Sequence, residues 1–425
     1  MRALLGVLIM ALGLAQGVVQ YRLSSGATLS VKQRPDSPAV AVQVWVGVGS
    51  LAEGINQKGM AHFLEHMLFN GSEGYAQGEI DQIVESMGGS INAGTSKDFT
   101  YYHITIAKPY WKDALRLIYH LTQKPLLKEE AIEKEKPIVL EEIKRKDDDP
   151  RNKLWEELEK QVYKISPYRD PILGFERTVS AFTQQDLIEF FKNYYAPQAV
   201  NIVVVGDVDP EEVYQLAENT FGKEEKRQLK KPKASKEPQQ LENRSKLVQD
   251  SRLSNAYWAI AWRVPGIKSH EYPALIVLDQ ILGTGRTSVL FREVRERGFA
   301  SLVSSGDFSR PEDNIFYIFA STSPDRVDSL RERVFSLLNN PESIITKEAV
   351  ESAKRRLINS RAFEHERVQS EAFSIGYNLT VGKSLNLYLH YDNSIMSVTK
   401  EDVLNVLNKY IVAKPYSEVI LSPQR

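Results

Sequence analysis

Two histidines and a glutamate stand within five consecutive residues, His62-Phe63-Leu64-Glu65-His66. On a helix, residues four apart share a face, so both imidazoles can reach one metal ion with Glu65 beside them. A hydrolytic zinc site needs two or three such ligands, an open position for water, and a carboxylate that takes a proton from that water. The motif supplies all of these parts except one ligand. The alternative is a helix whose histidines are surface residues or ordinary hydrogen-bonding groups.

The missing ligand should be a carboxylate on a second helix, and residues 128–147 offer several glutamates. On a helical wheel, Glu142 lies almost in line with Glu135 on the more apolar side, whereas Glu141 lies among the charged residues. We therefore predict Glu142 as the ligand and Glu135 as a carboxylate that supports the site. Pro137 removes one helical hydrogen bond and can kink this helix.

The inverted motif His62-x-x-Glu65-His66, followed by Glu142 in a Glu-x6-Glu segment, resembles the pitrilysin family of inverzincins. This family includes insulin-degrading enzyme, the mitochondrial processing peptidase and many two-domain bacterial peptidases. The resemblance covers essentially the whole mature chain. It implies one Zn²⁺ per chain, with His62, His66 and Glu142 as ligands, Glu65 as the catalytic base and Glu135 as the supporting carboxylate.

A second resemblance to the family lies in residues 89–95 and 98–102, which match the edge strand along which substrate pairs as an added strand. It implies that Asn92 and Ala93 bind substrate. The alternative is an ordinary sheet edge with an asparagine at a turn.

The second half of the chain has no zinc motif, because residues 272–283 are apolar or neutral where a repeat would place the ligands. In the family this half supplies an arginine and a tyrosine seven residues apart, which bind substrate and stabilise the oxyanion. Arg295 matches the arginine, but Ser301 and Leu302 stand where the tyrosine is expected. We therefore expect a partner, either a homologous subunit that carries the Arg/Tyr pair or a second copy in which Ser301 or another hydroxyl substitutes.

The elements that position these residues follow one order twice. The first half predicts strands, then a helix after Gly59, then strands at 90–95 and 99–107, helices over 112–195 and a buried strand at 201–206. Thr183–Tyr194 and Thr399–Tyr410 are both capped helices, each followed by a proline and a hydrophobic strand. This agreement indicates an internal duplication.

We therefore predict an α+β fold of two homologous tandem domains, each a mainly antiparallel sheet covered by helices. Residues 16–221 form the zinc-bearing domain, and 247–425 form the non-metallic copy. Residues 222–246 lack periodicity and are rich in Lys, Glu, Gln, Pro and Ser, so they form a charged linker.

Composition excludes several functions. The 425 residues carry 54 basic and 55 acidic side chains, a net charge of -1, which gives no field that attracts nucleic acid or anionic lipid. Residues 1–15 read as a signal peptide, with an apolar run shorter than the roughly 20 residues of a spanning helix. We expect export to the periplasm or secretion, without stable membrane insertion. With 0 cysteines, any zinc must be held by nitrogen and oxygen ligands.

The function predicted from these patterns is that of a zinc-dependent endopeptidase, which hydrolyses peptides or unfolded segments inside a dimeric chamber. Glu65 takes the proton of a zinc-bound water. The alternatives are a subunit of a cell-envelope peptidase assembly that binds peptides without cleaving them, and a structural subunit whose metal has no catalytic role.

Overall fold

The computed structural model describes residues 17–230 and 236–424. The predicted signal peptide, residues 1–15, lies outside this part. The described chain forms two compact units. The first comprises the residues up to Ile143 together with Pro171–Lys233 and Glu364–Leu389, and the second comprises Lys144–Asp170, Ala234–Phe363 and His390–Arg425. No helix within the described residues is long and apolar enough to cross a membrane.

The first unit contains a six-stranded sheet in the order β1-β2-β6-β3-β5-β4. Only β2 and β6 run parallel, and the other neighbours are antiparallel. The central strand β3 is buried on both faces because helices cover both sides of it. The strands are β1 (Val18–Arg22), β2 (Thr28–Gln33), β3 (Ala39–Val46), β4 (Ser90–Thr95), β5 (Thr100–Ala107) and β6 (Val200–Gly206).

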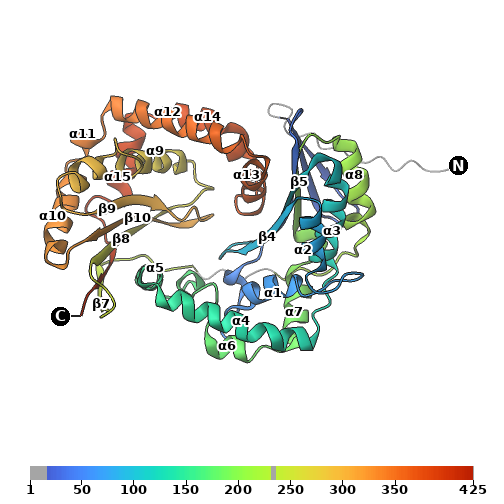
Figure 1. The fold of residues 1–425 in the computed structure, drawn as a ribbon. Helices are drawn as coiled ribbons and strands as arrows, with labels where there is room; N and C mark the ends of the chain where they lie inside the picture. Colours follow the sequence, from blue (N-terminus) through green and yellow to red (C-terminus); the bar gives the residue numbers. More distant parts are fainter. Residues whose placement is uncertain (1–16, 231–235, 425) are drawn as a thin grey trace. The chain divides into compact units, whose positions relative to one another are not determined.

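Helices cover both faces of this sheet, with α3 and α8 on one side and α13 on the other (Figure 1). One face forms the main hydrophobic core with residues of α1, α3, α7 and α8. On the other face, α13 packs on β3 and β6, with Gly376 against the indole of Trp45. The helices are α1 (Met60–Leu68), α2 (Glu79–Ser86), α3 (Trp111–Gln123), α4 (Glu129–Asp148), α6 (Glu176–Ser180), α7 (Gln184–Tyr194), α8 (Pro210–Asn219) and α13 (Val368–Thr380). Helix α4 runs without a break through Pro137.

A buried ionic network holds residues 364–389 against the first sheet. The carboxylate of Glu371 is almost fully buried; it pairs with the Lys32 ammonium at 2.7 Å and with the Arg34 guanidinium. The hydroxyl of Tyr388 donates to the same carboxylate at 3.0 Å. Because an unpaired buried charge is costly, this network specifies where the segment packs.

The second unit contains a five-stranded sheet in the order β7-β11-β8-β10-β9, which repeats the order β2-β6-β3-β5-β4 of the first. The β7–β11 pair is parallel, as is β2–β6. Both α7 and α15 begin with a threonine-aspartate capping box. The predicted α+β fold of two homologous domains is confirmed. The strands are β7 (Arg244–Gln249), β8 (Ala256–Pro265), β9 (Leu302–Asp307), β10 (Asp313–Thr322) and β11 (Ser417–Ser422).

The remaining helices are α5 (Pro150–Val162), α9 (Tyr272–Leu282), α10 (Val327–Leu338), α11 (Pro341–Ile344), α12 (Lys347–Glu364), α14 (Asn386–Ser397) and α15 (Lys400–Tyr410). Helix α5 comes from the first half of the sequence but packs on the second sheet, where Trp155 lies 4.7 Å from the Tyr317 ring. Single helical turns occur at Ser50–Ala52, Lys108–Tyr110, Pro167–Arg169, Pro197–Ala199, Phe221–Lys223 and Pro324–Arg326, and a π-helical turn at Phe291–Arg295.

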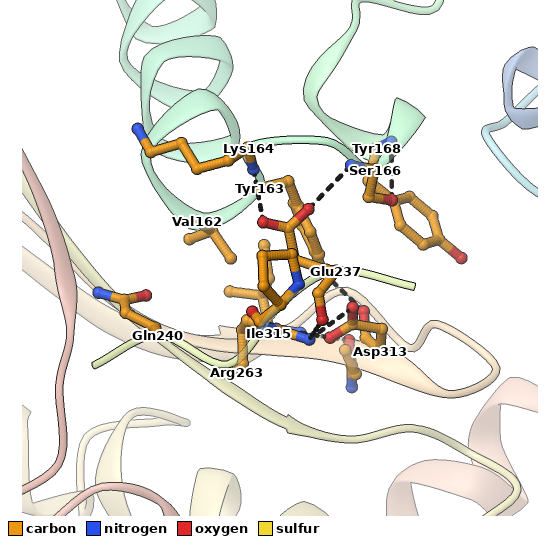
Figure 2. Close-up of polar contacts among 12 residues, drawn as sticks. Val162, Tyr163, Lys164, Ser166, Tyr168, Glu237, Gln240, Arg263, Asp313 and Ile315 are labelled. Atoms are coloured by element: carbon orange, nitrogen blue, oxygen red, sulfur yellow. Dashed lines mark hydrogen bonds and ion pairs between the residues drawn. The ribbon is translucent and has the colours of Figure 1, made fainter. Parts of the chain in front are cut away.

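The connection between the sequence halves is anchored within the second unit. The Glu237 carboxylate accepts hydrogen bonds from the backbone N–H groups of Lys164, Ile165 and Ser166 at 2.7 to 2.9 Å (Figure 2). The predicted limits at residues 221 and 246 stay a prediction. The packing units themselves interleave along the chain, since each takes in a segment from the other half of the sequence.

Candidate metal centre and strand edge

Helix α1 is fixed at its first turn by a buried carboxylate. Glu53 accepts from the backbone N–H of Gly59 at 3.0 Å and from that of Ala61 at 2.8 Å. A negative group at a helix N-terminus satisfies unpaired N–H groups and complements the helix dipole. Gly59 itself has φ 96, and a Cβ there would lie 2.5 Å from the carbonyl oxygen of Leu173. Only glycine therefore fits at this start of the helix.

The structure brings His62, His66 and Glu142 together. The Nε2 atoms of both histidines lie 3.6 Å from Oε2 of Glu142. One ligand atom from each of the three lies within 4.8 Å of the other two, and this is the only such group within the described residues. Tetrahedral zinc with bonds of about 2.0–2.1 Å separates its ligand atoms by roughly 3.4 Å. The three side chains thus fit one zinc ion.

Glu135 holds His66 from the side opposite Glu142. Its Oε1 lies 2.9 Å from Nδ1 of His66, and its Oε2 accepts from the side-chain amide of Asn70 at 2.9 Å. Burial lowers the pKa of His66, but the neighbouring Glu135 outweighs it and raises that pKa overall. The same hydrogen bond from His66 holds the pKa of Glu135 below its usual value. A histidine that donates Nδ1–H to a carboxylate leaves Nε2 free for a metal.

His62 is buried, with 8% of its surface exposed. Burial lowers the pKa of His62 to about 3, so its ring is neutral at physiological pH. The neutral imidazole is the form that binds metal. Its Nδ1 is buried without a hydrogen-bond partner within the described part of the chain.

Glu65 connects α1 to the sheet. Its carboxylate accepts a hydrogen bond of 2.5 Å from the hydroxyl of Thr95, the last residue of β4. Burial raises the pKa of the Glu65 carboxyl. The structure therefore places Glu65 between the candidate metal ligands of its own helix and the end of an edge strand.

The edge strand β4 contains Asn92 and Ala93. The backbone N–H of Ser96 donates to the carbonyl of Phe99 at the end of the β4–β5 hairpin. Because hydrogen-bonded pairs alternate along antiparallel strands, Ala93 and Thr95 direct their backbone groups away from β5. Consistent with this, the N–H of Ala93 is bonded to the Asn92 side chain at 2.8 Å. The outer edge of β4 can accept another strand.

Arg295 and Ser301 lie in the second unit. Arg295 ends the π-helical turn, is exposed, and has its guanidinium carbon 5.0 Å from the centre of the Phe291 ring. The hydroxyl of Ser301 donates to the carbonyl of Ser321 at 3.0 Å. The Ser301 proton is thus engaged within its own unit. On α4, Glu141 is exposed and lies outside the metal-binding group.

Sequence reasoning missed Asn70, Gln77 and Thr95. Asn70 connects Glu135 to the side-chain amide of Gln77 through a hydrogen bond of 2.5 Å. Asn70 lies just beyond the end of α1 at Leu68, and its position four residues after His66 was the available signal. Thr95 gives no such signal, because its contact with Glu65 depends on how β4 meets α1.

Comparisons with known proteins show which families and relatives this chain resembles. Residues 28–176 match the family described as "Insulinase (Peptidase family M16)", and residues 181–357 match "Peptidase M16 inactive domain". A Bacillus subtilis protein named "Uncharacterized zinc protease YmxG" is 28% identical over 413 residues, which cover 96% of this chain and 98% of that protein.

Solved structures share the fold. The structure of a protease from Helicobacter pylori superposes with a TM-score of 0.90 at 25% identity, covering 96% of this chain and 99% of that one. A Pseudomonas fluorescens structure described as a peptidase M16 inactive domain gives a TM-score of 0.84 at 21% identity, covering 96% and 98% of the two chains.

Proposed function

Because the chain belongs to the M16, or pitrilysin, family of two-domain peptidases, we propose that it is a zinc-dependent endopeptidase that hydrolyses peptides or unfolded segments. The observation that carries this proposal is the convergence of His62, His66 and Glu142 beside the carboxylate of Glu65. A surface helix without a metal has no need of a glutamate from another helix at 3.6 Å from both imidazoles.

Each side chain has a distinct role in this proposal. His62, His66 and Glu142 hold the ion, and Glu135 orients His66 through Nδ1. Zinc bound there would polarise the scissile carbonyl and make a water molecule more acidic. Glu65 takes the proton from the attacking water and returns it to the leaving amine. The Thr95 hydroxyl holds the Glu65 carboxylate toward the strand edge where the substrate lies.

The substrate in this proposal is an extended peptide paired with β4. Backbone hydrogen bonds to Ala93 and Thr95 require no particular sequence, so one edge can accept many peptides. The Asn92 side chain, which now bonds the Ala93 N–H, has to move aside for the peptide carbonyl. A folded protein hides most of its extended segments, and this favours peptides and unfolded segments as substrates.

We also propose that the chain is exported through residues 1–15 and acts in the periplasm or after secretion.

The oxyanion-binding pair is incomplete in this chain. Arg295 lacks a tyrosine seven residues later, and the Ser301 hydroxyl is already bonded to the carbonyl of Ser321. We therefore propose a homologous subunit that supplies an Arg/Tyr pair, with a second copy of this chain as the alternative partner. Loss of one oxyanion donor costs roughly a hundredfold in turnover. The isolated chain should bind zinc but cleave peptides slowly. Full turnover by the isolated chain, unchanged in Arg295→Ala, would contradict the need for a partner subunit.

The metal assignment is tested by elemental analysis of the purified protein with cleavage of a quenched peptide library. The parent and Glu141→Gln should each hold about one zinc per chain, because three protein ligands and water complete a catalytic site. Glu142→Gln, one residue further on the same helix, should lose zinc and activity together. Zinc retained by Glu142→Gln but lost by Glu141→Gln would refute the ligand set. A zinc-loaded chain that binds peptides, yet cleaves none with any homologous partner, would be a non-catalytic subunit.

A further inference from the structure

The two faces of strand β4 carry different residues near its end. Successive residues of a strand point to opposite faces, so Thr95 lies on the face of α1 and Glu65, and Gly94 lies on the other. Gly94 pairs with Tyr101 across the β4–β5 ladder. A Cβ at position 94 would lie 2.9 Å from Cε1 of Tyr101. The Tyr101 ring therefore extends over Gly94 toward the open edge.

The Tyr101 ring is part of a larger aromatic surface. It stacks on Trp45 at 4.7 Å and meets Phe373 of α13 edge-on at 5.3 Å. Phe373 is 37% exposed, so part of its ring is accessible to a ligand. We call Tyr101 and Phe373 the aromatic platform. A pocket of about 520 Å³ opens beside it, lined by Tyr101, Phe373 and polar residues of the 364–378 segment.

A peptide that pairs with β4 as an added strand directs one of its side chains to the aromatic platform. Side chains directly opposite each other on paired strands point to the same face. The peptide residue opposite Gly94 is therefore directed to the platform, while its neighbours in the peptide face α1 and Glu65. Gly94 has no side chain to separate that peptide residue from the Tyr101 ring.

We propose that the aromatic platform is a side-chain subsite for an aromatic or long aliphatic residue of an extended peptide bound along β4. The subsite takes the residue adjacent to one whose side chain faces Glu65. It thereby adds selectivity to an edge whose backbone pairing is independent of sequence. This inference rests on the proposed function, since it needs a peptide paired with β4.

A purely structural role predicts something different. An aromatic ring beside an edge glycine stabilises a sheet by covering it, and in the second unit Tyr317 lies over Gly306 in the same way. Covering Gly94 does not require the exposed Phe373. If the rings only stabilise the sheet, their removal lowers stability without changing which peptides are preferred.

The test uses the zinc-loaded full chain and a set of peptides in which one Phe is moved, residue by residue, through an extended Ser/Ala sequence. The cleavage site is located by mass spectrometry and kcat/KM is measured for each peptide. The same peptides are titrated against Glu65→Gln by fluorescence anisotropy, so that binding is read even where cleavage is absent. The variants are Phe373→Ala and Gly94→Ala, with Phe363→Ala as the control, since Phe363 is 69% exposed and outside the platform.

We expect Phe to improve binding over the Ser/Ala peptide without Phe by roughly tenfold or more, as a hydrophobic contact of this size provides. Because backbone pairing leaves the register of the peptide free, the cleavage site should move with the Phe at a fixed spacing. Phe373→Ala and Gly94→Ala should remove most of the gain in binding, while Phe363→Ala leaves it unchanged. The inference is overturned if peptides bind but Phe gives no gain, if the gain persists in both variants, or if the cleavage site does not follow the Phe. Peptides that show the expected gain in binding to Glu65→Gln, but are never cleaved by the parent either alone or with a homologous partner, would refute the proposed activity and leave the subsite supported.

Discussion

Replacing Glu135 by Gln tests whether this carboxylate orients His66 as a metal ligand. The two oxygens of Glu135 face two donors, Nδ1–H of His66 at 2.9 Å and the amide of Asn70 at 2.9 Å. The amide of Gln has one oxygen and one NH₂ group. Whichever way it is turned, one of the two donors then faces another donor. The variant thus keeps the shape of the side chain and loses one hydrogen bond to a charged, buried acceptor.

The size of the effect follows from that loss. A hydrogen bond to a charged group contributes about 1.5–3 kcal/mol. Since about 1.4 kcal/mol is a factor of ten, Glu135→Gln should weaken zinc binding by roughly 10- to 100-fold, the range found when partners of metal-bound histidines are removed.

The assay is a competitive titration with a fluorescent zinc chelator, which reports the dissociation constant directly. The matched control is Glu133→Gln on the same helix, because the Glu133 side chain is 62% exposed and pairs only locally with Lys136 in the described structure. Both variants should retain the thermal unfolding of the parent apoprotein within a few degrees. A zinc affinity of Glu135→Gln within twofold of the parent would refute the orienting role of Glu135.

Two further predictions concern stability. Burial and the nearby Asp307 raise the pKa of Asp279 to about 6, from 3.8. The ionised carboxylate therefore destabilises the folded state at higher pH, and Asp279→Asn should stabilise the second unit by about 1–3 kcal/mol at pH 8. At pH 3.5, where the carboxyl is largely protonated in both the folded and the unfolded state, the substitution should not stabilise the unit. Thermal unfolding at both pH values checks this, and equal effects at both would contradict it. Gly59→Ala places a Cβ 2.5 Å from the Leu173 carbonyl oxygen, so it should lower the melting temperature and weaken zinc binding. Gly54→Ala, whose Cβ meets no atom closer than 3.4 Å, is its control, and equal behaviour of the two variants would refute the strain at Gly59.

The candidate metal ligands could be predicted from the sequence because the spacing that brings them together is local. The four-residue spacing of His62 and His66 fixes their common face on any helix. The choice of Glu142 over Glu141 needed only the period of α4, and the structure brings Glu142 to both histidines. The strand order could be expected to repeat because both halves share their capped helix, proline and final strand.

Other features depend on how elements pack and could not be predicted. The apolar face of α5 or α13 shows that each helix covers a sheet, but not which one. The Glu371 network and the packing of Trp155 decide this in the folded chain. Likewise, the hydrogen bond between Thr95 and Glu65 joins residues 30 positions apart whose neighbours give no pattern.

The measurement that tests the central claim most directly is the zinc content and peptide cleavage of Glu65→Gln, determined on one preparation with the partner subunit that gives the parent its full activity. The amide keeps the shape of the side chain and can still accept the Thr95 hydrogen bond, but it cannot take a proton from water. We predict about one zinc per chain, as in the parent, with cleavage reduced by at least roughly a hundredfold. Cleavage at the parental rate with zinc retained would contradict the account, because Glu65 would then not be the catalytic base.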